Sequence, residues 1–388
     1  DVCSSDLGRR CRSGDGRGSA VATFAAVSVP AIGAAEVREP EWDGTSHSPG
    51  WVQAENQREG TDAWRITNQN YVGFVEGYAG ATSALLGEVV TLYVRTTAPG
   101  FTAAVYRMGY YGGTYARLVW TSDLVAAVAQ PTATFDRKTG MVEARWLPTL
   151  ELTVGTDWVP GDYLIKLTSS ENHQSYIPLA VRDPATSASV LLINAVATWQ
   201  AYNKWGGCSR YECSGHKGYN RASKLSFDRP YRRSSGKGAG QFLENEFPMV
   251  AFVEELGIDV SYATSIDLDQ HPEIARAVHG VLLMGHDEYY SAAMRGALVT
   301  ARGAGVNLGF FGANEVYRRV VFENSSDGRP MRVMADYPQP TSSPPWWQPW
   351  NAGSEWRRFR KPEHALVGVG YLCNRVKRSL VVRHAGNW

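Results

Sequence analysis

The sequence has no long apolar segment and almost no net charge. No run of about 18 apolar residues follows the short apolar stretch at residues 19–34, so no membrane-spanning helix is predicted. The 39 basic and 38 acidic residues are interspersed along the 388 residues and leave a net charge of +1. A charge this balanced argues against binding to nucleic acid or to an anionic membrane surface.

Motifs of several common enzyme classes are also missing. The chain contains no glycine-rich dinucleotide-binding fingerprint, no Gly-Lys-Ser/Thr phosphate loop and no Gly-x-Ser-x-Gly nucleophile elbow. Its five cysteines do not follow a four-ligand zinc pattern. Cys208 and Cys213 are near enough in sequence to pair in a disulfide, and the sequence leaves their oxidation state open.

The two ends of the chain are not expected to be ordinary domain sequence. Residues 1–7 resemble translated sequencing-adaptor sequence, and four arginines within residues 9–17 precede the apolar residues 19–34. Basic residues before a short apolar core are typical of a secretory signal peptide, so residues 1–40 predict a secreted or cell-surface protein. The alternative is a disordered alanine-rich tail on a cytoplasmic protein. The chain stops at Trp388 inside a domain pattern, which predicts an incomplete C-terminal domain.

Residues 41–186 are predicted to form a β-sandwich of immunoglobulin-like type. Polar and apolar residues alternate at 89–96 and 102–107, and two further strands at 163–168 and 176–181 follow at hairpin spacing. Glycine- and proline-containing turns separate these strands. Several short alternating strands over about 100 residues are typical of such a sandwich.

Residues 187–388 change to an alternation of buried strands and helices. The predicted strands lie at 189–194, 259–263, 280–284 and 306–311, and the predicted helices lie at 242–255, 272–278 and 291–304. Buried strands that alternate with helices form a parallel sheet with helices on both faces. We therefore predict a three-layer α/β domain, similar in layout to a glutamine amidotransferase. A proline- and tryptophan-rich stretch at 338–350 is expected to be a long loop, either a lid or a packing element.

Three ionisable residues follow the predicted strand at 280–284. His286, Asp287 and Glu288 lie between this strand and the helix predicted at 291–304. Parallel sheets place their sites outside the carboxyl ends of the strands, and the start of a helix favours an ionised carboxylate. This position therefore predicts a functional site. The alternative is that Asp287 and Glu288 only cap the helix.

Polar residues also follow two other strands of the predicted sheet. Tyr202 and Asn203 come after the first strand, and Asn314 comes after the fourth. These turns are expected to share one crevice with Glu288. No cysteine or serine directly follows the third strand, where an amidotransferase of similar layout would carry its nucleophile. A metal with bound water would supply the missing reactive group.

Four short motifs stand at these strand ends and in the loop between them. They are TWQAYN at 198–203, SFDRPY at 226–231, GHDEY at 285–289 and FFGAN at 310–314. Together they resemble the large (β) subunit of N,N-dimethylformamidase and its actinobacterial relatives. The resemblance covers roughly residues 50–388, and the GHDEY motif is its most specific part.

The resemblance implies hydrolysis of a small amide with a mononuclear ferric ion, Fe(III), held by two tyrosinates and one glutamate. It makes Glu288 the carboxylate ligand, Tyr202 and Tyr231 the tyrosinates, and His286 and Asn314 the catalytic groups beside the metal. Phenolate and carboxylate oxygens suit a hard cation, whose charge would lower the pKa of the tyrosines. His286 would move protons to the departing amine, and Asn314 would orient water or donate to the developing oxyanion.

Some parts of this assignment stay open. Tyr211 and Tyr219 lie in the same loop as Tyr231 and are alternatives for the second tyrosinate. A further acidic residue of the family's site is expected beyond Trp388. The expected partners are a small amide substrate and either a second copy of the chain or the small subunit that the true formamidase has. The alternative function is a secreted, non-catalytic carbohydrate- or metal-binding module with a degenerate α/β domain, in which the tyrosines only pack.

Overall fold

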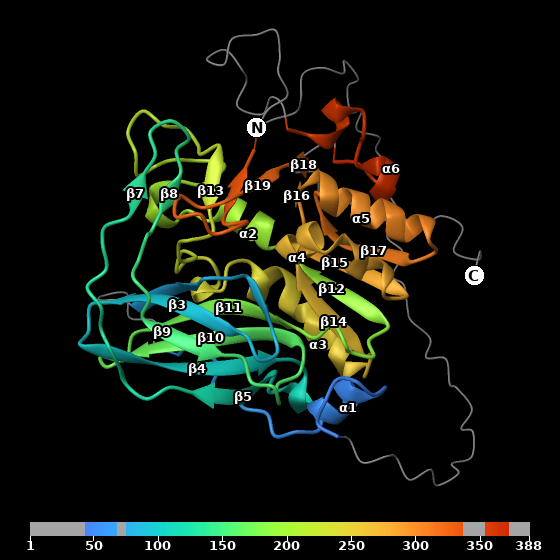
Figure 1. Ribbon diagram of the computed structural model, residues 1–388, viewed down its shortest axis with the longest axis horizontal. Coiled ribbons are helices and arrows are strands. Elements are labelled where there is room, and N and C mark those ends of the chain that lie inside the picture. The colour runs from blue at the N-terminus through green and yellow to red at the C-terminus, as the bar shows by residue number, and fades with distance from the viewer. Residues whose placement is uncertain (1–42, 68–74, 337–353, 372–388) are drawn as a thin grey trace, which may run out of the picture. The chain divides into compact units, whose positions relative to one another are not determined.

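The computed structural model describes residues 43–67, 75–336 and 354–371 (Figure 1). Residues Trp42–Gly370 form one compact unit. The leader at 1–40, the loop at 338–350 and the chain after residue 371 lie outside the described residues. The predictions made for those segments, and for the domain boundary near residue 186, stay predictions.

Two sheets form in the first half of this unit, and their strand pairs are antiparallel except for β2 with β11, which is parallel. One sheet has the order β1 (Val75–Ala79), β3 (Val89–Thr96) and β9 (Leu150–Thr153). The other has the order β2 (Ser83–Leu85), β11 (Gln174–Arg182), β10 (Gly161–Ser169), β4 (Gly100–Met108) and β5 (Ala116–Thr121), with β6 (Val125–Ala126) paired to β4. Alternate residues of these strands share one apolar core, which includes Leu92, Phe101, Val105, Ile165 and Ile177. The strands predicted from alternation are therefore present as β3, β4, β10 and β11.

The second half contains a parallel sheet of four strands. Their order is β14 (Val260–Thr264), β12 (Val190–Asn194), β15 (Gly280–His286) and β17 (Asn307–Ala313). Leu192, Tyr262 and Met284 pack with α2 (Val196–Tyr202), η4 (Phe242–Glu246) and α3 (Phe247–Glu255). Leu191, Ile193 and Leu283 pack instead with α5 (Ala292–Gly303) and with Leu268 of α4 (Ser265–Gln270). Because neighbouring residues of a strand point to opposite faces, the sheet carries helices on both sides.

The helix that follows β15 begins at a serine. The Oγ atom of Ser291 accepts a hydrogen bond from the backbone N–H of Met294 at 3.1 Å, and the first turn of α5 contains no acidic residue. Ser291 therefore caps α5, and Asp287 and Glu288 do not. Of the other predicted helices, 242–255 is a π-helical turn followed by α3, and 272–278 is the 3₁₀ segment η5 (Pro272–Arg276).

Short elements surround the carboxyl ends of the parallel strands. β16 (Tyr289–Tyr290) pairs in parallel with β18 (Arg318–Arg319), which sets Arg318 beside Tyr289. β13 (Lys224–Ser226), β20 (Val333–Ala335) and β19 (Val321–Glu323) form an antiparallel sheet. The remaining elements are α1 (Trp51–Asn56), η1 (Tyr111–Gly113), β7 (Thr134–Phe135), β8 (Val142–Glu143), η2 (Trp205–Gly207), η3 (Gly236–Gly238), η7 (Trp356–Phe359) and α6 (His364–Val367).

A buried ion pair joins the antiparallel sheets to the α/β part. Arg107 of β4 donates from Nη2 to Oε1 of Glu254 at 2.6 Å and from Nη1 to Oε2 at 3.1 Å. Both side chains are fully buried. The hydroxyl of Tyr262 also donates to Oε1 of Glu254, so both carboxylate oxygens of Glu254 accept hydrogen bonds. The two halves therefore meet at a bidentate contact that tolerates little displacement.

Cys208 and Cys213 are paired in a disulfide in the loop between α2 and β13. In the described part of the chain, no helix has the length and apolar character needed to cross a bilayer.

Candidate active site around Glu288

Glu288 lies just beyond the carboxyl end of β15, and its backbone is fixed on two sides. Its N–H donates to Oγ1 of Thr198 in α2 at 2.9 Å. Its carbonyl oxygen accepts from the N–H groups of Tyr317 and Arg318. The Glu288 side chain is only 3% exposed. The carboxylate is thus held in a defined position between α2 and the β16–β18 pair.

Two tyrosine hydroxyls converge on this carboxylate. Tyr202, the last residue of α2, donates to Oε2 of Glu288 at 2.8 Å. Tyr211 donates to Oε2 at 2.9 Å and lies 3.1 Å from Oε1. The two tyrosine rings have centroids 4.5 Å apart. The hydroxyl of Tyr289 in turn donates to the Tyr211 oxygen at 2.7 Å, so Tyr289 and Tyr211 form a chain that ends on the carboxylate, while Tyr202 donates to it directly.

His286 and Asn314 complete the cluster. Nε2 of His286 lies 3.4 Å from Oε2 of Glu288 and 3.3 Å from Nδ2 of Asn314. Nε2 can donate to the Glu288 carboxylate or accept from Nδ2 of Asn314 but cannot do both at once, so the tautomer of His286 decides which of the two hydrogen bonds forms. The His286 ring also lies against Tyr202, with ring centroids 4.9 Å apart. Asn314 therefore reaches Glu288 only through His286.

Two facing glycines allow this arrangement of strand ends. Gly285 of β15 and Gly312 of β17 are register partners. Gly285 has φ of 70°, and a Cβ there would lie 2.5 Å from the carbonyl oxygen of Asn245. A Cβ on Gly312 would lie 2.7 Å from the backbone carbonyl oxygen of Gly285. Only glycine satisfies both the left-handed backbone at 285 and the close approach at 312.

The charge of Glu288 is set by competing effects. Burial alone would raise the pKa of the Glu288 carboxyl, but the hydrogen bond from His286 and the positive charge of Arg318 outweigh it and lower that pKa. Nε of Arg318 lies 3.4 Å from Oε1 of Glu288. Burial, followed by the Glu288 charge, raises the pKa of Tyr202. Burial and the neighbouring Tyr289 raise that of Tyr211. The cluster therefore consists of a carboxylate anion with protonated phenols around it.

Asp287 points away from this cluster. It is fully buried and accepts a hydrogen bond from the Tyr290 hydroxyl. Burial raises the pKa of Asp287 and also that of Glu315, whose pKa the Asp287 charge raises further. Of Asp287 and Glu288, only Glu288 accepts hydrogen bonds from Tyr202 and Tyr211.

A comparison with family models shows which family the chain belongs to. The model described as N,N-dimethylformamidase beta subunit-like, C-terminal, matches residues 102–388, which is more than half of the chain. The chain belongs to this family. The family name indicates a dimethylformamidase-like hydrolase. A comparison with curated proteins finds no significant match.

Three solved structures share only weak likeness with this dimethylformamidase-like chain. One concerns T cell specificity and activation by the bacterial superantigen toxic shock syndrome toxin-1, with 17% identity, a TM-score of 0.16, and coverage of 28% of this chain and 98% of that one. A cycloisomaltooligosaccharide glucanotransferase from Paenibacillus sp. has 11% identity, a TM-score of 0.19, and coverage of 50% and 27%. A complex of Dpr2 Ig1-Ig2 with DIP-Theta Ig1-Ig3 has 10% identity, a TM-score of 0.16, and coverage of 31% and 41%. Scores this low support no argument about fold or function.

Tyr231 lies outside the Glu288 cluster of the dimethylformamidase-like chain. Its ring packs edge-on against Trp199, with centroids 6.1 Å apart and planes at 67°. Its charged neighbours are Arg332, Arg229 and Glu246. Within the described residues, no hydrogen bond links Tyr231 to Glu288. Of the residues predicted for the site, the structure brings together Tyr202, Glu288, His286 and Asn314, and it adds Tyr211.

Tyr219, the other alternative for the second tyrosinate, is engaged elsewhere. Its ring packs edge-on against Phe135, with centroids 4.8 Å apart. The sequence named Tyr211 only as an alternative, included Tyr289 in the GHDEY motif without giving it a role, and gave no signal for Arg318. Arg318 reaches Glu288 because β18 pairs with β16, a contact between two-residue strands that no periodic pattern marks.

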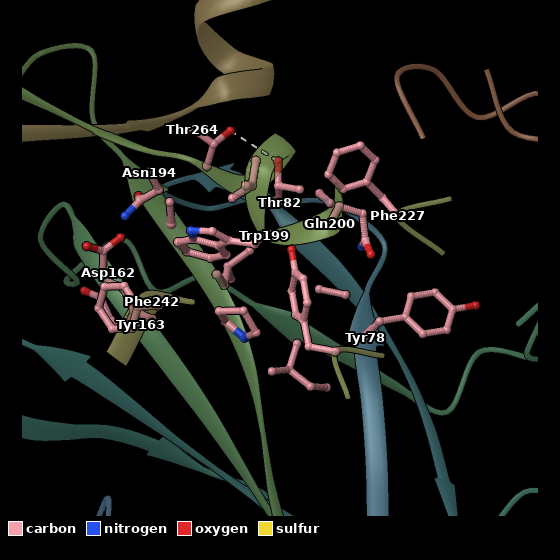
Figure 2. Close-up of a pocket in the computed structure, with 18 of the residues that line it drawn as sticks. Tyr78, Thr82, Asp162, Tyr163, Asn194, Trp199, Gln200, Phe227, Phe242 and Thr264 are labelled. Carbon is pink, nitrogen blue, oxygen red and sulfur yellow. Dashed lines mark hydrogen bonds between the residues drawn. The ribbon is translucent and has the colours of Figure 1, made fainter. Parts of the chain in front are cut away.

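Tyr231 lines a separate cavity between α2 and the antiparallel sheets. Figure 2 shows Asp162, Asn194 and Trp199 on one side of it and Tyr78, Gln200 and Phe227 on the other. Its volume of about 40 Å³ is enough for water molecules. Oδ2 of Asp162 and Oδ1 of Asn194 are buried and have no hydrogen-bond partner among the described residues. Burial raises the pKa of Asp162 to about 7. The cavity is thus polar, and it lies beside α2, the helix that ends at Tyr202.

The Glu288 cluster offers a set of oxygen donors that suits a hard cation. Within the described residues, no group of three or more histidines, cysteines and acids could hold a metal. Glu288, Tyr202 and Tyr211 form a different kind of set, with one carboxylate and two phenols separated by 2.8–3.1 Å. Phenol and carboxylate oxygens are hard ligands, and a nearby cation would reverse the upward shift of the tyrosine pKa values.

Proposed function

We propose that this protein is an iron-dependent amidohydrolase that cleaves the C–N bond of a small amide. The convergence of Tyr202 and Tyr211 on Glu288, with His286 and Asn314 beside them, carries the proposal. In this proposal Tyr202, Tyr211 and Glu288 would hold a mononuclear Fe(III), and Tyr211 takes the role that the resemblance gave to Tyr231. When bound, the ion would polarise the amide carbonyl and lower the pKa of a water molecule.

The residues of the chain account for the other requirements of hydrolysis. Water gives its oxygen to the acyl carbon as the C–N bond breaks, and the amine leaves with a proton, so nothing is oxidised or reduced. His286 is the group beside Glu288 that can hold and pass on a proton. Asn314, at 3.3 Å from the imidazole, orients that ring. Burial of Glu288 keeps bulk water from competing for the hydrogen bonds that Tyr202 and Tyr211 donate to it.

Finer assignments belong to the same proposal. We infer that the antiparallel sheets form an immunoglobulin-like sandwich and that the α/β part is related to glutamine amidotransferases. The disulfide between Cys208 and Cys213 favours an exported protein, because disulfides persist in oxidising compartments. The family name refers to a β subunit, which favours a partner subunit for this chain as well.

The test uses the full-length protein. Its iron content is measured together with visible absorption, since a phenolate bound to Fe(III) absorbs visible light, and amine release from N,N-dimethylformamide is followed. Glu288→Gln should keep the fold and lose most of the iron, whereas the exposed Glu244→Gln should change neither. A wild-type protein without iron or turnover would contradict the proposal and favour a non-catalytic binding module. Unchanged iron in Glu288→Gln would remove Glu288 from the ligand set.

A further inference from the structure

A second cavity lies directly against the Glu288 cluster. It has a volume of about 230 Å³ and is lined by Arg210, Tyr211, Asn220, Arg221 and Arg318. This volume is below the roughly 300–1,000 Å³ of sites for drug-sized ligands, so the cavity suits a small molecule. Three of its five lining residues are arginines, and none is acidic.

The cavity and the cluster share two walls. Tyr211 lines the cavity, and its hydroxyl lies 2.9 Å from Oε2 of Glu288. Arg318 also lines the cavity, and its Nε lies 3.4 Å from Oε1 of Glu288. A small molecule with one end at Glu288 would therefore extend its other end toward Arg210 and Arg221.

The three guanidinium groups are not equally neutralised. Arg210 forms an ion pair with Asp336, and Arg318 faces Glu288 and donates to Oγ of Ser354. Arg221 is half-buried and has no ion-pair partner among the described residues. Burial, and next the charge of Arg210, lowers the pKa of Arg221 to about 10, so it is still a cation at neutral pH. A half-buried cation beside two others favours an anionic ligand.

We propose that this arginine cavity binds the carboxylate of the substrate, so that the preferred amides are N-acyl amino acids rather than neutral amides. This inference rests on the function proposed above. Guanidinium groups match the planar carboxylate with paired hydrogen bonds. Among the described residues, no hydrogen bond or ion pair engages the Arg221 guanidinium, so its donors are the ones placed for that contact. For N-formylglycine, water cleaves the C–N bond to give formate and glycine.

The kinetic test compares two substrates of the same shape in the full-length, iron-containing protein. N-formylglycine carries a carboxylate where N-isobutylformamide carries two methyl groups. We expect kcat/KM to be at least about 10-fold higher for N-formylglycine, and Arg221→Met to lower this ratio by about 10- to 100-fold, because a hydrogen bond to a charged group is lost. Arg221→Lys should lower the ratio less. Arg276→Met, which changes an exposed arginine of η5, should leave the ratio unchanged.

A binding measurement separates this inference from the proposed function. Levulinate, a keto acid that cannot be hydrolysed, is titrated calorimetrically against wild-type protein and Arg221→Met, with 5-methylhexan-2-one as its neutral counterpart. Levulinate binding that weakens about 10- to 100-fold in Arg221→Met supports the carboxylate site, even in a protein that hydrolyses no amide. Hydrolysis of N-isobutylformamide with equal or higher kcat/KM, together with no levulinate binding, overturns the inference and leaves the proposed hydrolysis intact. Melting temperatures close to that of the wild type exclude misfolding of the variants as the cause.

Discussion

The Tyr211 hydroxyl lies within 3.1 Å of both carboxylate oxygens of Glu288, although 77 residues separate the two in sequence. This contact distinguishes Tyr211 from the other tyrosines of its loop. Tyr231 packs on Trp199, and Tyr219 packs on Phe135. The relationship makes Tyr211 the partner of Tyr202 in any oxygen-donor site built on Glu288.

The first prediction concerns the choice between Tyr211 and Tyr231. Loss of a residue that only hydrogen-bonds a metal ligand typically lowers metal affinity by roughly 10- to 100-fold. Tyr211→Phe should lower the iron affinity by more than this, because it removes an oxygen that binds the metal in the proposal. Tyr231→Phe should retain the iron and its visible absorption. Iron is quantified after equilibrium dialysis. Retention of iron in Tyr211→Phe together with its loss in Tyr231→Phe would restore the assignment that the family resemblance implied.

The second prediction separates the proton-transfer group from the iron ligands. His286→Ala should retain the iron and its colour, because the imidazole contacts Glu288 at 3.4 Å rather than supplying the donor set. Amide hydrolysis should fall by roughly 100- to 10,000-fold, the usual contribution of a positioned acid or base. Loss of iron in His286→Ala would instead make His286 a ligand. Asn314→Ala should retain iron as well and lower kcat less than His286→Ala, since Asn314 acts through the imidazole.

The third prediction concerns the ion pair between β4 and α3. Glu254→Gln should lower the free energy of unfolding by about 3–5 kcal/mol, because it leaves the fully buried Arg107 without its counter-charge. Chemical denaturation measures the change. The adjacent Glu255→Gln is the matched control, and its exposed side chain should change stability by less than about 0.5 kcal/mol. Equal effects of the two variants would show that the buried pair does not hold the two halves together.

The fourth prediction concerns the pH dependence of stability. Burial raises the pKa of Asp162 to about 7, above the value of about 3.9 for an unfolded chain. The contribution of the Asp162 carboxyl to the free energy of unfolding is therefore fully present below about pH 4 and is lost as the pH rises through about 7. Glu254 and Arg107 face Asp162 with opposite effects on its pKa, and the Asp162 charge also acts on Glu246. Between pH 4 and pH 8, Asp162→Asn should gain up to about 4 kcal/mol relative to the wild type.

The control for that experiment is the exposed Asp123→Asn, whose stability difference from the wild type should be flat over the same range. Unfolding by urea at fixed ionic strength gives both differences. A flat difference for Asp162→Asn as well would mean that water in the cavity of Figure 2 solvates the carboxylate.

The elements that could be predicted from the sequence are those with a periodic pattern. β3 alternates because one of its faces packs into the apolar core, whereas β10 and β11 are covered on both faces. β12 and β15 contain apolar runs because both faces of the parallel sheet are covered. His286 and Glu288 could be predicted because the apolar run that marks β15 also marks where the strand ends. His286 is the last residue of β15, and Glu288 follows two residues later. Their position depends on one strand and one turn only.

The rest of the site depends on contacts that no local pattern encodes. The loop from α2 to η4 has little regular structure, and its course is set by the buried Arg229, which donates to the carbonyl oxygens of Gln200, Asn203, Trp205 and Cys208. Which tyrosine this loop turns toward Glu288 follows from those contacts and not from spacing. The arginine cavity could not be predicted because Arg318 comes from a distant part of the chain and meets Arg210 and Arg221 only in the fold.

The disulfide described above encloses one member of the site. Cys208 and Cys213 are five positions apart, and Tyr211 lies between them. Inside the closed loop, the N–H groups of Tyr211 and Glu212 donate to Oγ of Ser209, and the N–H of Arg210 donates to the carbonyl oxygen of Ala201 in α2. Reduction of the disulfide to two thiols would lengthen the tether that holds this phenol over the carboxylate. Retention of the proposed iron would then depend on the thiol–disulfide balance of the surroundings as well as on the supply of iron.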